Sequence, residues 1–277
     1  MPTHIEWCDE SWNPVTGCTP ISAGCQNCYA KRMATRLRGR FGYPADDPFA
    51  VTLHGNCLSR KDSPVHWRKP RVVFVVSMGD LFHEHVHDEW ITSVFAIMDL
   101  APQHTYLLLT KRAKRMQYEL DAWADVRGGA NPNWWAGVSI EDQVTADERI
   151  PILLKTPAAH RFVSCEPLLG PVWLPASTIS RLVARDSADI VGDQIDAVIC
   201  GGESGPGARP MHPDWARSLR DQCAAAGVPY FLKQRGEYLD LPKRSTSSCG
   251  MVRVGKHAAG RLLDGREHND LPWRIQP

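Results

Sequence analysis

Three cysteines lie close together near the start of the chain. Cys18, Cys25 and Cys28 fall within the stretch GCTPISAGCQNCYA, residues 17–30, in the spacing C-x6-C-x2-C. Thiolates bind soft and borderline metals, so three of them in one loop could hold a metal or an iron–sulfur cluster. Three thiolates would also leave one coordination position for another ligand. The spacing therefore predicts a metal centre whose coordination the loop does not complete.

Two kinds of centre fit this loop. Structural zinc usually takes four protein ligands, and a distant cysteine or histidine would have to complete the set. A [4Fe-4S] cluster is ordinarily held by four thiolates, and with only three of them one iron stays open to a small molecule. Gly17 and Gly24 each precede a cysteine, and Pro14 and Pro20 interrupt helix. This composition favours a loop that wraps closely around a cluster with its backbone N–H groups toward sulfur.

The elements that must position this loop alternate between short apolar runs and helical patterns, as expected of a parallel sheet flanked by helices. We expect a (β/α)8 TIM-type barrel, partial or irregular if the weak first two runs are not strands, with the cysteine loop after the first strand. We expect one domain over residues 1–277, with its core at about 4–238 and a C-terminal extension at 239–277. The eight candidate strands are HIEW (4–7), AVTLH (50–54), VVFVVS (72–77), TYLLLT (105–110), WWAGVS (134–139), RFVSCE (161–166), DAVICGG (196–202) and PYFLKQ (229–234).

The sequence predicts three helices between these runs. The first follows Cys28 and should bury an apolar face that consists of Ala30, Met33, Ala34 and Leu37. The second should bury Ile91, Val94, Phe95 and Met98, with Asp88 as its cap and Pro102 as its stop. The third should run from Pro213 to Gly227.

The composition indicates the cellular compartment and the kinds of partner to expect. The nine cysteines are odd in number, and six stand singly: Cys8, Cys57, Cys165, Cys200, Cys223 and Cys249. No segment approaches the roughly 18 apolar residues of a membrane span. We therefore expect a cytoplasmic protein without a disulfide framework or a membrane partner. The formal net charge is only +1, but residues 26–75 hold ten Lys or Arg against three acids, and KRAKR follows at 111–115. Such segments could bind phosphate, with a solvated helix face as the alternative.

The cysteine loop, followed by a helix in a chain of repeating βα units, resembles the radical S-adenosylmethionine superfamily. The usual superfamily spacing is C-x3-C-x2-C, so the first gap is longer here. More narrowly, WNPVTGCTPISAGCQNCYA, SMGDLFHE, FVSCEPLLGP, GGESGPGARPM and FLKQRGEY resemble a phage- and bacteria-associated family of three-cysteine, radical-S-adenosylmethionine-like proteins. The resemblance covers Ile5 to Tyr238. It implies that Cys18, Cys25 and Cys28 bind a [4Fe-4S] cluster whose open iron chelates the amino and carboxylate groups of S-adenosylmethionine.

The resemblance also directs attention to residues at strand ends, where barrel enzymes place their chemistry. It implies that Ser77 and Asp80 of SMGD hold the methionine amino group, although Asp80 could instead cap the next helix. Ser139, Glu141 and Arg209 are further candidates for binding the cosubstrate, the first two at its ribose. Glu166, Glu203 and Lys233 are the candidates for catalysis or substrate binding. For Glu166, Glu203, Arg209 and Lys233, structural ion pairs in the barrel mouth are the alternative.

These expectations define a radical S-adenosylmethionine enzyme. Reductive cleavage of S-adenosylmethionine would give methionine and a 5′-deoxyadenosyl radical, which abstracts hydrogen from a substrate. We expect this substrate to be a nucleic-acid base or a modified nucleotide, and the electron donor to be a flavodoxin or ferredoxin. The reaction would be a modification, rearrangement or repair. The alternative is a non-catalytic nucleic-acid-binding protein that zinc or an iron–sulfur cluster stabilises.

Two further patterns need an interpretation. HEHVH, residues 83–87, contains the H-E-x-x-H pattern of zinc proteases, which requires both histidines on one helical face. Its place between a strand and a helix cap instead predicts a solvated or substrate-facing loop. Trp7, Trp12, Trp134, Trp135 and Tyr29 could stack nucleobases, but for most tryptophans we favour ordinary core or rim positions.

Overall fold

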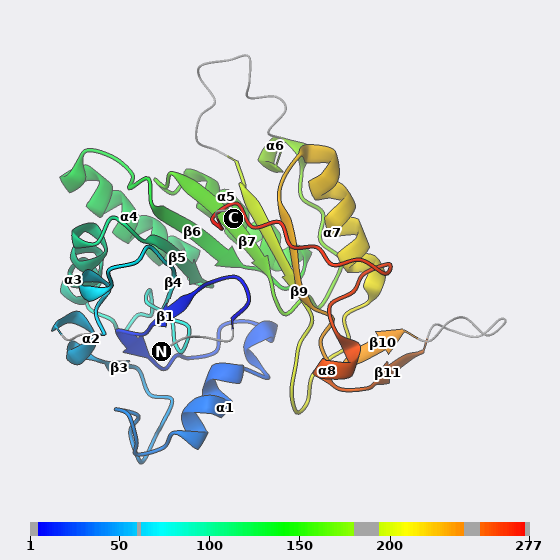
Figure 1. Ribbon diagram of the computed structural model, residues 1–277, viewed down its shortest axis with the longest axis horizontal. Helices are drawn as coiled ribbons and strands as arrows, with labels where there is room; N and C mark the ends of the chain where they lie inside the picture. Colours follow the sequence, from blue (N-terminus) through cyan, green and yellow to red (C-terminus); the bar gives the residue numbers. More distant parts are fainter. Residues whose placement is uncertain (1–4, 60–61, 180–193, 241–249, 275–277) are drawn as a thin grey trace.

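A computed structural model describes residues 5–59, 62–179, 194–240 and 250–274. Its centre is a curled sheet of seven parallel strands in the order β1-β4-β5-β6-β7-β8-β9 (Figure 1). Apolar side chains on both faces suit strands that are covered on both sides. The strands are β1 (Glu10–Trp12), β4 (Val72–Val75), β5 (Thr105–Thr110), β6 (Trp134–Ser139), β7 (His160–Cys165), β8 (Ala197–Gly201) and β9 (Tyr230–Gln234).

Helices cover the convex face of the sheet. The core between them joins one face of the strands to the apolar sides of α3 (Asp88–Leu100), α4 (Ala113–Arg127), α5 (Gln143–Lys155) and α7 (Pro213–Ala226). Local signals fix their ends: Asp142 accepts a hydrogen bond from the N–H of Thr145 in a capping box before α5, and Gly128 and Gly227 end α4 and α7 in the left-handed conformation. No helix in the described ranges is long and apolar enough to cross a bilayer.

Shorter elements complete the described chain. They are β2 (Val15–Thr16), η1 (Ala23–Cys25), α1 (Tyr29–Arg36), β3 (Thr52–Leu53), α2 (Gly55–Ser59), η2 (Pro64–His66), α6 (Ala176–Ile179), β10 (Tyr238–Asp240), β11 (Met251–Arg253) and α8 (Lys256–Ala259). β2 pairs with β3, and β10 with β11, both antiparallel. Cys249 and part of the predicted C-terminal extension lie outside the described residues.

The predicted closed barrel of eight strands is wrong, and the partial barrel describes the fold. In HIEW, the residues from Ile5 to Trp7 form no strand; the first strand is β1, a few residues later. Trp7 instead buries its ring against Phe74 on the concave face. AVTLH supplies only the two residues of β3, which pair with β2 outside the main sheet. In the described residues, β1 and β9 are therefore the two edges of an open sheet.

The other six predicted strands are confirmed, with shifts of one or two residues at some ends. The predicted helices are also present, but two details are wrong. Met33 on α1 is 41% exposed, whereas Ala30 and Ala34 are buried as expected. Asp88 is the first residue of α3 and His87 is its cap, without a side-chain capping bond. The amphipathic spacing predicted where the helices are, but it did not predict which side chains of α1 the rest of the protein buries.

Aromatic residues from both ends of the chain fill the amino half of the concave face. Trp7 and Trp273 lie in one buried cluster with side chains from β4 to β9, and the indole N–H of Trp273 donates to the carbonyl of Trp7 at 2.9 Å. Trp273 packs edge-on against Trp135 and Phe162. Trp12 and Trp134 are buried on the other face, so these tryptophans are core residues, as favoured above. The carboxyl half of the concave face carries smaller and charged side chains.

Candidate metal centre at the three-cysteine loop

The cysteine loop lies at the carboxyl edge of the sheet, between β2 and α1. The N–H of Gly17 donates to the carbonyl of Met78 at 3.0 Å, which fixes the loop to the turn after β4. Cys18, Cys25 and Cys28 are partly exposed, whereas Cys8, Cys165, Cys200 and Cys223 are buried. Cys165 and Cys200 lie side by side in the helix-covered core, and burial raises the pKa of both thiols. Cys57, on α2, is also partly exposed, so the three clustered cysteines are distinguished from it by sharing one loop.

Each of the three thiols has a hydrogen-bond donor or a helix start beside it, but Cys18 is protonated at neutral pH. Arg112 Nη1 donates to Cys18 Sγ at 3.3 Å, and Ser22 Oγ lies 3.8 Å from Cys25 Sγ. Cys28 occupies the N-cap of α1, where the helix dipole favours negative charge. Burial, and then the Asp80 carboxylate, raise the pKa of the Cys18 thiol to about 11, against the opposing effect of Arg112. A metal bound to Cys18 would therefore displace a proton.

The loop supplies three thiols as possible ligands. A closed zinc site takes four protein ligands, whereas three thiolates can each bind a different iron of a [4Fe-4S] cluster and leave the fourth iron open. Over the ranges that the structure describes, no group of three or more Cys, His, Asp or Glu side chains forms a metal site as it stands. The number of thiols in the loop therefore fits a cluster with one open iron.

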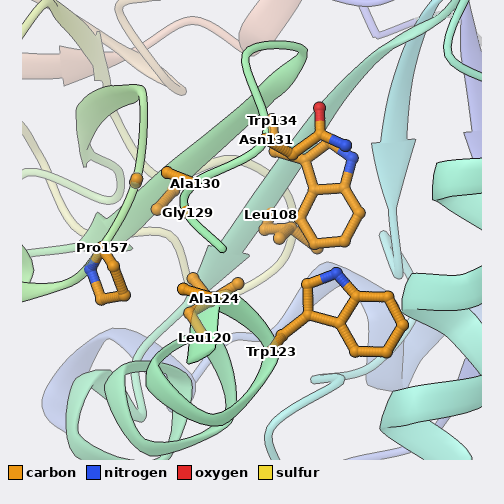
Figure 2. Close-up of a pocket in the computed structure, with 11 residues that line it drawn as sticks. Leu108, Leu120, Trp123, Ala124, Gly129, Ala130, Asn131, Trp134 and Pro157 are labelled. Carbon is orange, nitrogen blue, oxygen red and sulfur yellow. The ribbon is translucent and has the colours of Figure 1, made fainter. Parts of the chain in front are cut away.

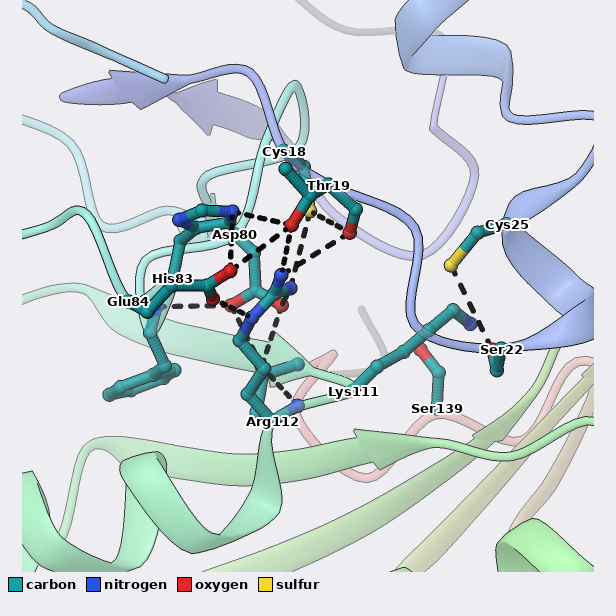
Figure 3. A network of polar contacts seen from close by, with 12 residues as sticks. Cys18, Thr19, Ser22, Cys25, Asp80, His83, Glu84, Lys111, Arg112 and Ser139 are labelled. Atoms are coloured by element: carbon teal, nitrogen blue, oxygen red, sulfur yellow. Dashed lines mark hydrogen bonds and ion pairs between the residues drawn. The ribbon is translucent and has the colours of Figure 1, made fainter. Parts of the chain in front are cut away.

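Asp80 anchors the first side of the loop through Arg112 (Figure 3). The Asp80 carboxylate accepts hydrogen bonds from Thr110 Oγ1, at 2.8 Å to each oxygen, and from Arg112 Nη1 at 3.2 Å. Arg112 extends from the end of β5 and also donates to the carbonyl and hydroxyl of Thr19, at 3.2 and 3.0 Å. The N–H of Phe82 donates to Asp80, but α3 begins only at Asp88, so Asp80 does not cap that helix.

Glu141 anchors the middle of the loop from the end of β6. Its fully buried carboxylate lies 2.7 Å from Lys111 Nζ and 3.2 Å from Arg149 Nη1, and it accepts a hydrogen bond from Ser22 Oγ at 2.8 Å. Burial alone would raise the pKa of Glu141, but the Lys111 and Arg149 cations outweigh it and lower the pKa. A Cβ on Gly24 would lie 2.5 Å from this side chain, so the glycine is needed for the loop to approach it.

Glu203 anchors the third side from the end of β8. Its carboxylate accepts hydrogen bonds from Arg209 Nη2 at 2.7 Å, Arg209 Nε at 2.9 Å and Asn27 Nδ2 at 3.0 Å. Arg209 also donates to the carbonyl of Ala23 in the loop at 2.9 Å. Desolvation opposes ionisation of Glu203, but the bonds from Arg209 and Asn27 lower its pKa. Glu203 and Arg209 thus form the ion pair that the sequence left as the alternative.

The two predicted serines lie beside these anchors. Ser77, after β4, accepts a hydrogen bond from Tyr29 at its carbonyl, while its hydroxyl contacts Ser11 and donates to Asn13 Oδ1 at 3.2 Å. Ser139 ends β6 beside Lys111 in Figure 3, and its carbonyl accepts from Arg149 Nη1 at 2.7 Å. Both serines are buried at the edge that holds the cysteine loop.

Glu166 and Lys233 form a separate pair on the concave face. Lys233 Nζ of β9 lies 2.7 Å from an oxygen of Glu166, which follows β7, and both side chains are 19% exposed. The pair spans β8 at Gly201, where a Cβ would lie 3.2 Å from the Glu166 carboxyl carbon. Unlike Asp80, Glu141 and Glu203, this pair forms no hydrogen bond or ion pair with the cysteine loop in the described part of the chain. Among the predicted charged site residues, Glu166 and Lys233 are therefore the two that do not hold the cysteine loop in place.

Sequence reasoning missed the residues that connect the carboxylates to the loop, above all Arg112, Lys111, Ser22 and Asn27. A signal was available for Lys111 and Arg112, because both cations directly follow a strand.

HEHVH lies in the loop before α3, as predicted, and its geometry does not match a zinc-protease helix. His83 is fully buried and contacts Thr19 Oγ1 at 2.8 Å, so the expectation of a solvated or substrate-facing loop is wrong for His83. Burial and the nearby Arg112 cation lower the pKa of His83.

Two of the pockets in the described part of the chain lie at opposite edges of the sheet. A pocket of about 300 Å³ borders the cysteine loop at Ile21, with Lys111, Arg112 and Arg149 in its lining. A second space of only about 10 Å³ lies under α4 at the amino ends of β6 and β7, lined by Trp123, Trp134 and Pro157 among others (Figure 2). Of these two, the first borders the cysteine loop.

Among solved structures, spore photoproduct lyase is similar to this chain. A cysteine-to-serine mutant is 13% identical with a TM-score of 0.42, over 90% of this chain and 68% of that chain. A double mutant with bound AdoMet and dinucleoside spore photoproduct is 12% identical with a TM-score of 0.43, over 88% and 68%. No curated protein matches the sequence.

The sequence profile of one protein family matches residues 2–272. That match spans nearly the whole chain, including the cysteine loop and every strand of the sheet. The chain therefore belongs to the family described as "protein of unknown function (DUF5131)".

Proposed function

We propose that this protein is a radical S-adenosylmethionine enzyme in which Cys18, Cys25 and Cys28 hold a [4Fe-4S] cluster. One observation carries the proposal: the three accessible thiols lie on a loop at the carboxyl edge of a parallel sheet, anchored by carboxylates from three strands. Asp80, Glu141 and Glu203 each bind the loop or its supporting cations. Such rigid support is what a cofactor site requires.

The cluster and S-adenosylmethionine, when bound, would supply the one-electron chemistry that yields the 5′-deoxyadenosyl radical. The chain supplies orientation and charge. Ser77 and Asp80, next to Cys18, offer oxygen acceptors for the methionine ammonium group. Ser139, Glu141 and Arg209 are placed around the other side of the loop, where they would contact the rest of the cosubstrate. The tryptophans below exclude water from the amino half of the concave face.

The Glu166–Lys233 pair is the best candidate to bind the substrate, because it stands on the concave face without bonds to the loop. Glu203 is then a positioning residue for the loop. We propose a nucleic-acid base or a modified nucleotide as the substrate and a flavodoxin or ferredoxin as the electron donor. The Glu166–Lys233 pair could orient a base through hydrogen bonds, while exposed Lys and Arg side chains near the cysteine loop bind phosphate.

The test is anaerobic reconstitution with iron and sulfide, followed by low-temperature electron paramagnetic resonance of the reduced protein with and without S-adenosylmethionine. We expect a [4Fe-4S] signal that shifts on addition of S-adenosylmethionine, together with release of 5′-deoxyadenosine. Cys25→Ala should lose both. Cys57→Ala is the matched control, since Cys57 lies outside the loop and its thiol donates to the carbonyl of Asn13. A protein that retains only zinc, or a cluster that ignores S-adenosylmethionine, would support the non-catalytic nucleic-acid-binding alternative instead.

A further inference from the structure

The helix that follows the cysteine loop carries a positive surface. Residues 11–45 contain five Lys or Arg and no Asp or Glu, and two acids, Asp46 and Asp47, follow directly. Arg32 is turned inward and donates to the carbonyl of Ser204 at 2.9 Å. The other four cations, Lys31, Arg36, Arg38 and Arg40, are exposed. They form no ion pair with any described residue. Lys111 and Arg112, by contrast, are paired with Glu141 and with Asp80 and Glu84.

A tight turn after α1 holds an aromatic ring out in the same region. The N–H of Tyr43 donates to the carbonyl of Arg40 at 3.0 Å, which places Phe41 and Gly42 at the centre of the turn. Both have positive φ, 53° and 86°, as in the type I′ turn that favours Asn-Gly. Tyr43 is buried and anchors the turn, whereas Phe41 is 75% exposed. A bulky residue is unfavourable at positive φ, so the exposed position of Phe41 lowers the stability of the folded protein.

We propose that Lys31, Met33, Arg36, Arg38, Arg40 and Phe41, hereafter the α1 surface, bind a nucleic-acid strand. The cations would contact successive phosphates, and the Phe41 ring would stack on a base. Met33, 41% exposed and three residues before Arg36 on α1, adds apolar area beside that cation. Because α1 begins directly after Cys28, a strand on this surface runs past the cysteine loop. The inference deepens the proposed function, on which it rests, by assigning the surface that delivers the substrate.

An anionic membrane would also attract the cations, but the observations favour a nucleic acid. A membrane-binding helix presents a broad apolar face. The exposed rings here are instead two separate ones, Phe41 at the tip of the turn and Tyr29, 48% exposed, at the start of α1. Ala30 and Ala34, on the other side of α1, are buried in the protein. Separate rings among cations match the alternation of bases and phosphates along a strand.

The experiment measures the binding of fluorescent single-stranded DNA and RNA of one sequence to the full-length protein, by anisotropy over a range of salt concentrations. In the triple variant Arg36→Gln/Arg38→Gln/Arg40→Gln we expect affinity to fall at least about tenfold, and the slope of log K against log salt to shrink by about 2 to 3. The matched control is Arg68→Gln/Lys69→Gln/Lys155→Gln, which removes the same charge from exposed positions near the amino edge of the sheet. The control should retain nearly full affinity.

Phe41→Asn separates stacking from charge. Asn-Gly suits the turn, so the thermal midpoint should stay the same or rise, while affinity falls about tenfold without a change in the salt slope. The inference is overturned if the wild type binds neither nucleic acid, if both triple variants lose affinity equally, or if only vesicles containing phosphatidylserine are bound. These outcomes are independent of the cluster signal. The binding results can therefore fail while cleavage of S-adenosylmethionine succeeds, and the reverse.

Discussion

Arg112 and Cys18 are in direct contact: the Nη1 atom of Arg112 donates to the sulfur at 3.3 Å, although 94 residues separate the two in sequence. The same guanidinium binds Asp80 and Glu84, at 3.2 and 3.0 Å, so its position is fixed from both sides. A cation that donates to a sulfur atom stabilises negative charge on that sulfur. In the proposed cluster site, Arg112 would therefore stabilise the thiolate of Cys18.

We expect Arg112→Gln to make the reduction potential of the reconstituted cluster more negative, because hydrogen bonds to cluster sulfur favour the reduced, more negative state. A potentiometric titration followed by electron paramagnetic resonance measures this shift. Arg115→Gln is the control, since Arg115 pairs with Asp88 and Glu119 rather than with a cysteine. Equal potentials in wild type and Arg112→Gln would contradict the prediction.

The same substitution should destabilise the fold by about 3 kcal/mol, since it leaves the buried Asp80 carboxylate without its cation. Adding Asp80→Asn to Arg112→Gln should restore part of that loss, because the unpaired charge is removed as well. Urea unfolding of the two single variants and the double variant measures the coupling. Strictly additive losses would show that the pair is not coupled.

Gly24→Ala should prevent the loop from closing on Glu141. The new Cβ would lie 2.5 Å from a carboxylate that Lys111, Arg149 and Ser22 hold in place, so neither side can move cheaply. We expect a lower melting temperature and reduced iron incorporation after reconstitution. Gly55→Ala provides the comparison, because its Cβ would lie 3.9 Å from Trp90, an ordinary van der Waals contact. Iron content equal to that of wild type in Gly24→Ala would refute this role.

Acid should loosen the loop through Glu141 and Glu203, whose pKa values are lowered in the fold. Their ionised forms add stability above the unfolded carboxyl pKa of about 4.3, and that stability is lost as pH falls from there through the folded pKa. Glu141→Gln should therefore be less stable than wild type near pH 7 and show a shallower decline below about pH 4.5. Tryptophan fluorescence during urea unfolding at several pH values measures both effects. Parallel pH curves for the two proteins would count against it.

Glu166→Gln and Lys233→Met should change stability little, by about 1 kcal/mol or less, because their pair is partly exposed. Both variants should also keep the shift of the cluster signal on addition of S-adenosylmethionine, since the pair does not bind the loop. Denaturant unfolding and paramagnetic resonance test the two statements. A large loss of stability would instead assign the pair a structural role and remove it from the proposed substrate site.

The sequence predicted those parts of the molecule that local pattern determines. TYLLLT and WWAGVS match β5 and β6 at both ends because long apolar runs must be buried on two faces. The sequence did not predict β1, because its residue on the concave face is Ser11, which contacts Ser77 rather than an apolar core. The strand-end carboxylates were also identifiable, but their partners were not. Arg112 and Ser22 meet Cys18 and Glu141 through tertiary contacts that no spacing along the chain encodes.

Trp7 and Trp273 lie in one buried cluster that fills the amino half of the concave face, and the indole N–H of Trp273 donates to the carbonyl of Trp7. The proposed cosubstrate and substrate, if both bind the concave face, would therefore have to share its carboxyl half beside the cysteine loop. Whichever of the two binds nearer the aromatic cluster would have to bind first and leave last, so we expect compulsory-order rather than random-order kinetics.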